Sequence, residues 1–310
     1  MKSAVVNGPL GAVGQALVRC LINKGIETWA ICFPGDLRIQ HLPGEAHIVE
    51  CDMRRISSLP EHLPGGIDVF FHLAWMGTIG PGRNDVLLQT ENIRCAVEAA
   101  EIAQKLGCSV FVGVGSQAEY GQIEGVVKAD APCFPITGYG IAKLCAGQMT
   151  RLLCTQSGLR HVWARVLSAY GPGDGPLSVI PTLLDKLLKG ETPALTGGEQ
   201  LWDFCYSEDV AEALYCMAES GKDGAVYPVG SGRARPLRDY FELTRDAIDP
   251  SLPLGLGEIP YPKGQVMYLQ ADLTPLREDT GFIPRFSFEE GIRKTIAAYR
   301  EQMKERTLGR

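Results

Sequence analysis

The stretch Asn7-Gly8-Pro9-Leu10-Gly11-Ala12-Val13-Gly14 decides the fold that this sequence predicts. It follows a short apolar run over residues 3–6, which predicts a first β-strand, and it leads into a helical pattern over residues 12–24. A tight turn needs residues without a Cβ atom, and a backbone that approaches a pyrophosphate closely needs them too. The spacing G-x-x-G-x-x-G at the first strand–turn–helix unit therefore predicts a dinucleotide site, the alternative being a turn that only packs a helix on a sheet.

The residues around this turn define the expected cofactor contacts. We expect the cofactor phosphates to lie against Gly8, Leu10, Gly11, Ala12, Val13 and Gly14. An acidic residue for the adenosine ribose is expected about 20 residues further on, but Ile31-Cys32-Phe33-Pro34 occupies that place. Asp36 is close, and Arg38 could meet a 2′-phosphate or be a solvated loop residue. NAD and NADP both stay open, with NADP slightly favoured.

Strand and helix patterns alternate along the first half of the chain. Strands are expected over residues 3–7, 27–33, 46–50, 67–74 and 108–115, and helices over 12–24, 54–61, 84–106 and 138–157. This alternation predicts an α/β fold, a Rossmann-like doubly wound parallel sheet. We expect residues 1–170 to form the dinucleotide-binding domain, with strand 160–168 completing its sheet and part of 200–235 returning to it. Residues 171–310 predict a smaller, less regular C-terminal substrate lobe that ends in a helix over 287–304.

The composition excludes several classes of protein. Of the 310 residues, 45% are hydrophobic and 21% are charged, which is ordinary globular composition. The formal net charge of −6 argues against a partner nucleic acid bound through a basic face. No apolar run approaches the roughly 20 residues that span a bilayer, and no leader peptide is recognisable, so we expect a cytoplasmic protein without a membrane partner. The ten cysteines and five histidines lack metal-ligand spacing, so no metal is expected.

A tyrosine and a lysine four residues apart carry the expected chemistry. Tyr139 and Lys143 share one face of the predicted helix 138–157. A lysine beside a phenol, with an oxidised nicotinamide ring nearby, brings the phenol towards the range of a general base. Ser116 ends a predicted parallel strand, at the edge where ligands bind in open α/β sheets, and its hydroxyl could hold a carbonyl oxygen. A solvated helix face and a turn serine are the alternatives, and the order of the three residues favours catalysis.

Together these motifs resemble the extended short-chain dehydrogenase/reductase family, and within it the nucleotide-sugar epimerase/dehydratase group. The resemblance extends along most of the chain. The residues that carry it, besides the glycine turn, are Cys51-Asp52-Met53-Arg54, Phe71-His72-Leu73-Ala74, Thr90-Glu91-Asn92, Ser116 through Gly121, Tyr139-x-x-x-Lys143, Arg165 with Tyr170-Gly171-Pro172, and Asp203-Phe204-x-x-Ser207-x-Asp209-Val210.

The resemblance implies roles for individual residues. Asp52 and Met53 would contact the adenine side of the cofactor. Its other contacts would be Leu73, Ala74, Trp75, Asn92, Tyr139 and Lys143, with Lys143 on the nicotinamide ribose. The implied substrate-binding residues are Trp75, Ser116, Gln117, Arg165, Ser178, Val179, Ile180, Trp202 and Lys263. The family often dimerises by pairing helices that correspond to 84–106 and 138–157, so a homodimer is expected. The apolar stripe Ile93, Ala96, Val97 and Ala100 suits that contact or a contact with the sheet.

Three departures from the family pattern bear on the substrate. The Asp-Glu pair with which the 4,6-dehydratases eliminate water is replaced by Gln117 and Ala118, which argues against dehydration, and Glu119 is expected to point elsewhere. An arginine that pairs with the sugar diphosphate is replaced by Trp202, and a second one by Lys263. Arg233, Arg235 and Arg277 are candidate replacements. Trp75 stands where smaller residues are usual, as a wall of the sugar pocket or a core aromatic.

The sequence thus predicts an NAD(P)-dependent oxidoreductase or epimerase that acts on a hydroxyl or keto carbon, C4, of a nucleotide-activated hexose through Ser116, Tyr139 and Lys143. A 4-epimerase and a 4-keto reductase would share these residues. Two alternatives stay open: an NADPH-dependent reductase of a non-sugar carbonyl compound, and an NADP-sensing regulator without chemistry.

Overall fold

The computed structural model describes residues 1–262 and 264–308, with the side chains of 305–308 excepted. Its main element is a seven-stranded sheet of order β12-β7-β5-β4-β1-β2-β3, in which every neighbouring pair is parallel. The strands are β1 (Ser3–Asn7), β2 (Glu27–Cys32), β3 (His47–Glu50), β4 (Val69–His72), β5 (Val110–Ser116), β7 (Arg160–Val166) and β12 (Ala225–Val229). The predicted doubly wound parallel sheet is therefore confirmed.

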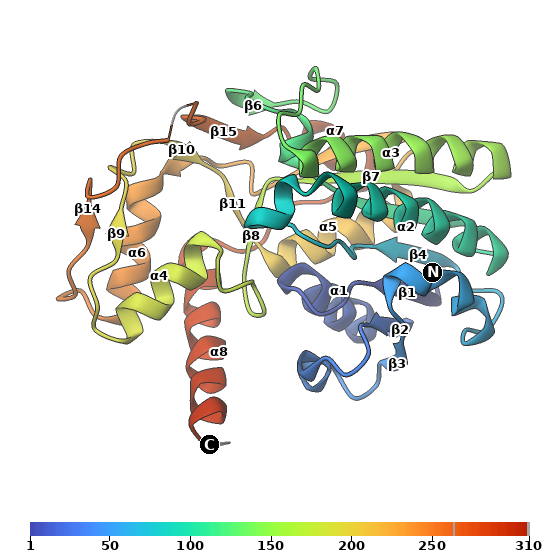
Figure 1. Cartoon of the computed structure of the whole chain (residues 1–310), viewed down its shortest axis with the longest axis horizontal. Helices are drawn as coiled ribbons and strands as arrows, with labels where there is room; N and C mark the ends of the chain where they lie inside the picture. Colours follow the sequence, from blue (N-terminus) through green and yellow to red (C-terminus); the bar gives the residue numbers. More distant parts are fainter. Residues whose placement is uncertain (263, 309–310) are drawn as a thin grey trace.

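Helices cover both faces of this sheet (Figure 1). On one face, α1 (Ala12–Asn23) packs against α5 (Ser207–Ser220), and their apolar residues join Ala4 and Val6 of β1 in one core. On the other face, α2 (Val86–Lys105) packs along α3 (Gly138–Ser157), above Val5 and Phe111. Strands buried on both faces are the reason that β1 and β4 read as continuous apolar runs.

The ends of the helices follow from local sequence. Asp85 and Thr137 cap α2 and α3, each accepting a hydrogen bond from a backbone N–H of the first turn. Gly158 ends α3 in the left-handed conformation, at φ 70°, where a residue with a Cβ atom would be strained. The predicted bounds of these helices differ from the observed ones by at most two residues.

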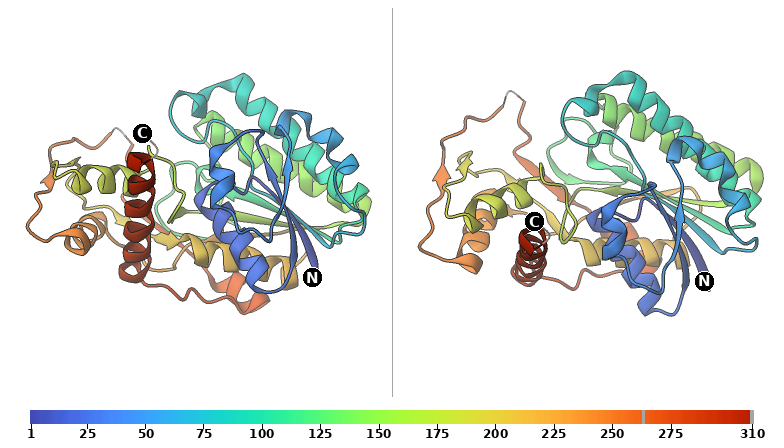
Figure 2. Two further views of the ribbon diagram at one scale, coloured as in Figure 1. Left: turned by 90° about the horizontal axis from the view of Figure 1, so that it is seen from below. Right: turned by 60° about the horizontal axis from the view of Figure 1, so that its bottom comes forward.

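The C-terminal half forms a smaller lobe beside the sheet (Figure 2). Helices α4 (Val179–Leu188), α6 (Leu237–Ile248) and α8 (Phe288–Leu308) enclose a core rich in aromatic rings. Its strands are short: β10 (Leu201–Trp202), β13 (Arg235–Pro236) and β15 (Tyr268–Ala271) make a four-stranded sheet with β6 (Gly125–Val127), which the N-terminal half contributes. Two further pairs join β8 (Ser168–Tyr170) to β11 (Phe204–Tyr206) and β9 (Ala194–Leu195) to β14 (Gly255–Leu256). Short helix α7 (Thr274–Thr280) packs on α5.

The chain crosses between the two parts more than once. Strand β12 and helix α5 lie beyond residue 170, yet β12 is part of the large sheet and α5 packs on it. The expected domain limits of 1–170 and 171–310 stay a prediction. The carboxylate of Asp203 fixes the return. It is fully buried and accepts hydrogen bonds from the Ser231 hydroxyl and from the backbone N–H groups of Ser231, Gly232 and Ala271, at 2.6–3.0 Å.

No helix in the described part of the chain is both long and apolar enough to cross a membrane. The cytoplasmic location expected from the sequence stays a prediction. All ten cysteines are free thiols, and no three His, Cys, Asp or Glu side chains among the described residues are grouped to hold a metal ion.

Candidate active site

The glycine turn joins β1 to α1 where the sheet order reverses, between β1 and β4. Gly8 has φ +90°, and a Cβ atom there would lie 2.4 Å from the backbone nitrogen of Ala74. A Cβ atom at Gly14 would lie 2.4 Å from the Gly8 carbonyl oxygen. Gly8 and Gly14 therefore permit the backbones of β1, α1 and the end of β4 to meet.

Gly11 has a different surrounding. A Cβ atom at Gly11 would meet no atom within 4 Å, so the backbone there faces open space. Gly11 is the N-cap of α1, no side chain caps this end, and the first turn carries no acidic residue. Free N–H groups and the positive end of the helix dipole favour an anion at this place. The turn thus fits the pyrophosphate of a dinucleotide, and Leu10, Ala12 and Val13 lie in the same turn.

Ser116 is the last residue of β5 and the N-cap of the 3₁₀ turn η4 (Gln117–Glu119). Its hydroxyl accepts a hydrogen bond from the Ala118 N–H at 3.2 Å. The Ser116 hydroxyl also lies close enough to the phenol of Tyr139, near the start of α3, to lower the pKa of that phenol. Two catalytic candidates from distant segments of the chain are therefore neighbours, and their catalytic roles stay a prediction.

Lys143 lies one turn further along α3 and is almost fully buried. Its ammonium group donates to the Val114 carbonyl at 2.5 Å and lies 6.0 Å from the centre of the Tyr139 ring. Burial lowers the pKa of Lys143 to about 7, although the negative charge of Glu119 acts in the opposite direction. Burial also raises the pKa of Tyr139, and the Ser116 side chain counters that rise. The phenol therefore depends on neighbouring polar and positive groups to ionise.

Trp75 contacts both catalytic candidates on α3. The Lys143 ammonium lies 3.8 Å from the centre of the indole, and the indole meets the Tyr139 ring edge-on at 6.2 Å. The indole N–H donates to Gln89. Trp75 is half-buried, so it forms a wall of the site. Whether the sugar or the cofactor lies against this wall stays a prediction, as do the contacts of Leu73 and Ala74.

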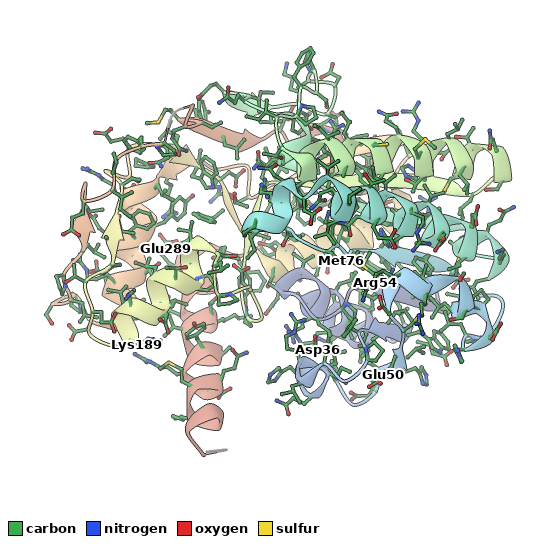
Figure 3. All side chains as sticks on the ribbon, in the orientation of Figure 1. Asp36, Glu50, Arg54, Met76, Lys189 and Glu289 are labelled. Atoms are coloured by element: carbon green, nitrogen blue, oxygen red, sulfur yellow. The ribbon has the colours of Figure 1, made fainter. Side chains whose placement is uncertain are left out.

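Asn92 acts beneath this wall. It is fully buried on α2, accepts from the Met76 N–H and donates to the Met76 carbonyl, both at 2.9 Å. Figure 3 labels Met76 beside α2. Asn92 therefore fixes the backbone that follows β4, and its contact with a cofactor stays a prediction. His72 is also buried, accepts from Asn7, and burial lowers its pKa to about 3, so it is neutral.

Glu119 and Arg165 form a buried ion pair below Ser116. Arg165 Nε donates to Glu119 Oε2 at 2.6 Å, and the carboxylate also accepts from the Ser116 N–H and the Trp163 indole. The Arg165 guanidinium stacks on the Tyr120 ring. Arg165 is 4% exposed, which does not fit the substrate contact expected from the sequence. Its charge is used inside the protein, where it holds Glu119.

At the outer end of the site, two short ion pairs follow β2 and β3, near Asp36 and Arg54 in Figure 3. Asp36 binds the side chain of Arg38 through both carboxylate oxygens, at 3.0 and 2.6 Å. Asp52 binds Arg54 in the same way. Both acids lie where the adenosine half is expected, and Met53 lies beside Asp52 in a half-exposed position.

The predicted substrate residues of the lobe differ in their surroundings. Ser178 occupies the N-cap position of α4, but its hydroxyl donates to Asp174 and not to the helix. Val179 is exposed. Ile180 is 1% exposed in the lobe core, so its side chain is a packing residue and not a substrate contact. The Trp202 indole donates to Ser168 at 2.8 Å. Gln117 is half-exposed in η4. Lys263 lies outside the described residues.

The three arginines suggested as replacements for the diphosphate-binding arginines line a cavity that does not include the catalytic candidates. Arg233, Arg235 and Arg277 line a cavity of about 600 Å³ beside α7 and the start of α8, and Arg235 pairs with Glu289 there. Ser116, Tyr139 and Lys143 are not among the residues of that cavity. A charge pattern in the sequence could not locate these arginines, because their positions depend on how the lobe folds.

Two residues next to the catalytic candidates were missed by the sequence reasoning. Glu119 was expected to point away from the place of the dehydratase acid and base. The structure buries its carboxylate against the Ser116 backbone N–H, Trp163 and Arg165, and the sequence did not indicate these contacts. Arg83 carried no motif, yet its guanidinium lies 4.5 Å above the centre of the Tyr139 ring. The one feature of the sequence that could have indicated the position of Glu119 is Arg165, an oppositely charged residue on the neighbouring strand β7.

The comparisons with known proteins agree with this geometry. The family profile described as "NAD dependent epimerase/dehydratase family" matches residues 4–230. The CDP-abequose synthase of Salmonella typhimurium is 25% identical over 302 residues, which cover 94% of this chain and 96% of that protein.

Two solved structures extend the comparison. The UDP-N-acetylglucosamine 4-epimerase of Methanobrevibacter ruminantium, bound to UDP-N-acetylmuramic acid, is 25% identical with a TM-score of 0.88, covering 97% of this chain and 99% of that one. MoeE5, bound to UDP-glucose and NAD, is 26% identical with a TM-score of 0.80 over 97% of this chain and 99% of that chain.

We expect Glu119 and Arg165 to be strongly coupled in their effects on the free energy of unfolding. Glu119→Gln should lower the free energy of unfolding by about 3–5 kcal/mol, because it leaves the Arg165 charge buried and unpaired. The double variant with Arg165→Met should recover much of that loss, since both charges are gone. Urea unfolding of the two single variants and the double variant measures the coupling.

The matched control is Arg94→Met on α2, which removes an arginine paired with Glu91 and Glu98 at the surface. Its effect should stay below about 1 kcal/mol. Simple addition of the two single losses in the double variant would contradict the assignment of a coupled pair.

Proposed function

Because the chain belongs to the NAD-dependent epimerase/dehydratase family, we propose that it is an NAD(P)-dependent enzyme that acts on C4 of a nucleotide-activated hexose. The observation that carries this proposal is that Ser116 lies near enough to Tyr139 to lower its pKa, with Lys143 on the next turn of α3. These groups lie at the carboxyl edge of the sheet that also carries the glycine turn. The relatives named above act on or bind nucleotide-sugars, which supports the same substrate class.

The residues present divide the acid–base work. Tyr139 removes the proton of the C4 hydroxyl or returns it to a C4 carbonyl oxygen, and Ser116 hydrogen-bonds the same oxygen and stabilises its developing negative charge. Lys143 favours the ionised form of Tyr139 by its positive charge. When bound at the glycine turn, the dinucleotide supplies or accepts the hydride.

Elimination of water does not fit this site. An acid or base is needed at the two positions after Ser116, and the chain has the amide of Gln117 and the buried methyl group of Ala118 there. We therefore propose a 4-epimerase or a 4-keto reductase, which need only Ser116, Tyr139 and Lys143. The retention of the cofactor distinguishes the two, since an epimerase recycles it and a reductase consumes it.

A second candidate function, reduction of a non-sugar carbonyl compound, is favoured by Trp202. The indole at this position donates to Ser168 and provides no positive charge for a diphosphate. A regulator that senses NADP without chemistry is less well supported, because a sensor has no need for a tyrosine beside a serine at a sheet edge.

The choice of dinucleotide depends on the Asp36–Arg38 pair. Asp36 holds the Arg38 guanidinium just beyond β2, and Arg38 lines a cavity of about 300 Å³ next to Gln15 of α1. A 2′-phosphate would meet a positive charge there, so we propose a modest preference for NADP over NAD. MoeE5, with its NAD, supports use of the nicotinamide dinucleotide but not this preference.

A homodimer through α2 and α3 is the proposed assembly. Ile141, Met149 and Leu152 are exposed along one side of α3, whereas Ala96 and Ala100 of α2 are fully buried beneath α3 and the sheet. Exposed apolar residues in a row on one helix are typical of an interface between subunits.

The proposed function predicts the behaviour of Tyr139→Phe. Turnover of a UDP-, CDP- or dTDP-hexose, or of its 4-keto form, should fall by at least about 100-fold, because the proton donor is lost, while dinucleotide binding persists. Sugar products are separated by chromatography, and the dinucleotide released from denatured wild-type protein is identified. Retained NAD or NADH supports an epimerase, and an empty protein stabilised by NADPH supports a reductase. Turnover that survives Tyr139→Phe would contradict the mechanism.

The cofactor proposal predicts the effect of Arg38→Ala. The Kd for NADPH should rise about tenfold, because a charge-assisted contact is lost, and the Kd for NADH should stay within about twofold. Calorimetric titration of both dinucleotides measures the ratio. Arg54→Ala, which removes the equivalent arginine after β3, is the matched control. Equal losses for NADPH and NADH would refute an Arg38 contact with a 2′-phosphate.

The assembly proposal predicts that Met149→Glu with Leu152→Glu converts a dimer into a monomer, because two buried carboxylates would face the partner helix. Light scattering after size exclusion measures the mass. Ile283→Glu, at an exposed apolar residue of the lobe, should leave the dimer intact. A wild-type protein that is monomeric at tens of micromolar would overturn the proposal.

A further inference from the structure

A second cation lies against the tyrosine of the site. Arg83 belongs to the 3₁₀ turn η3 (Pro81–Asn84), just before α2, and its guanidinium carbon lies 4.5 Å from the centre of the Tyr139 ring. It donates to the Thr78 carbonyl at 2.7 Å. A guanidinium at this distance from a phenol ring interacts favourably with it.

The turn that carries Arg83 is held in place by hydrogen bonds between side chains and backbone groups around it. Asn84 accepts a hydrogen bond from the Gly138 N–H, which joins η3 to the start of α3 next to Tyr139. The Gln89 side chain donates to the carbonyl groups of Gly77 and Gly82. A Cβ atom at Gly77 would lie 2.8 Å from the Gly82 carbonyl oxygen, so the two ends of the loop are in contact. The position of Arg83 over the ring therefore does not depend on its own side chain alone.

The charge of Arg83 is not neutralised by a carboxylate. Within residues 1–262 and 264–308, the described ion pairs do not include Arg83, and its hydrogen bond to Thr78 is to a neutral carbonyl. This distinguishes it from Arg165, whose charge is paired with Glu119. Among the described residues, no carboxylate is therefore paired with the positive charge that Arg83 presents to Tyr139.

Four other groups face Tyr139 or its surroundings. Ser116 comes from β5, Glu119 from η4, and Lys143 from α3 itself, while His72 at the end of β4 is neutral because burial lowers its pKa to about 3. Burial raises the pKa of Tyr139, and Glu119 adds to that rise, whereas Ser116 and Arg83 lower it. Burial lowers the pKa of Lys143 to about 7, so its positive charge diminishes near neutral pH. An arginine stays charged at every working pH.

We propose that Arg83 is a positioning residue for acid–base chemistry at Tyr139, a permanent positive charge over the phenol ring that favours the ionised phenol. The motif of tyrosine and lysine four residues apart does not include it. Its effect on catalysis rests on the proposed function, whereas its effect on the phenol does not.

The direct test is the ionisation of Tyr139 in the cofactor-free protein. Tyrosine labelled with ¹³C at Cζ gives one signal per residue, and the signal absent from Tyr139→Phe identifies Tyr139. Arg83→Met should raise the pH of its ionisation midpoint by about one unit, a tenfold change in the equilibrium. Arg83→Lys should return the midpoint towards the wild-type value, because the charge is restored.

Arg293→Met, at an exposed arginine of α8, is the matched control and should leave the midpoint unchanged. An unchanged midpoint in folded Arg83→Met, verified by circular dichroism, would overturn the proposal. If Arg83→Met does not fold, Arg83→Gln replaces it, with the same expectation. No substrate is needed, so the result stands even if nucleotide-sugars prove not to be substrates.

Once a substrate is identified, the pH profile gives a second readout. In Arg83→Met the limb of kcat that requires ionised Tyr139 should move to higher pH by the same amount, with KM unchanged. A rise in KM with an unmoved limb would assign Arg83 to substrate binding and would overturn its role at the phenol.

Discussion

The parallel pairing of β1 with β4 and of β4 with β5 is the constraint on which the site depends. Parallel strands end at the same edge of a sheet, so the glycine turn after β1, Trp75 after β4 and Ser116 at the end of β5 are neighbours although more than 100 residues separate them. The glycines then decide how closely these ends approach. Gly8 meets the backbone of Ala74 directly, and any side chain at that position would separate the phosphate turn from the rest of the site.

The protonation of Tyr139 and Lys143 depends on a small number of charged side chains near them. Tyr139 and Lys143 are buried, so each resists its charged form, and small changes around them have large effects on protonation. Glu119 lies below Ser116, where its charge favours protonated Lys143 and opposes ionised Tyr139. Pairing with Arg165 limits that opposition and satisfies the carboxylate at the same time. The site is therefore a balance of Arg83, Lys143, Glu119 and Arg165, not a simple tyrosine–lysine pair.

The smaller lobe is tied to this edge by buried polar groups as well as by its aromatic core. Asp203 follows β10 and accepts four hydrogen bonds from the segments after β12 and at the end of β15. Trp202, one residue earlier, reaches Ser168 at the end of the sheet domain. Two consecutive residues thus divide the work, since Asp203 ties together segments of the lobe and Trp202 bonds to β8.

The sequence alone determined the fold class and predicted the principal members of the site. Strand and helix periods, the glycine spacing and the order of Ser116, Tyr139 and Lys143 are local patterns, and local patterns survive without knowledge of the tertiary structure. The roles of Arg165 and Ile180 were decided only by the tertiary structure, which buries one against Glu119 and the other in the lobe core. Arg83 was also undetectable, because no pattern links a turn before α2 to a ring on α3. The sequence gives the charge and shape of each side chain. Its contacts depend on packing between distant segments, which come together only when the chain folds.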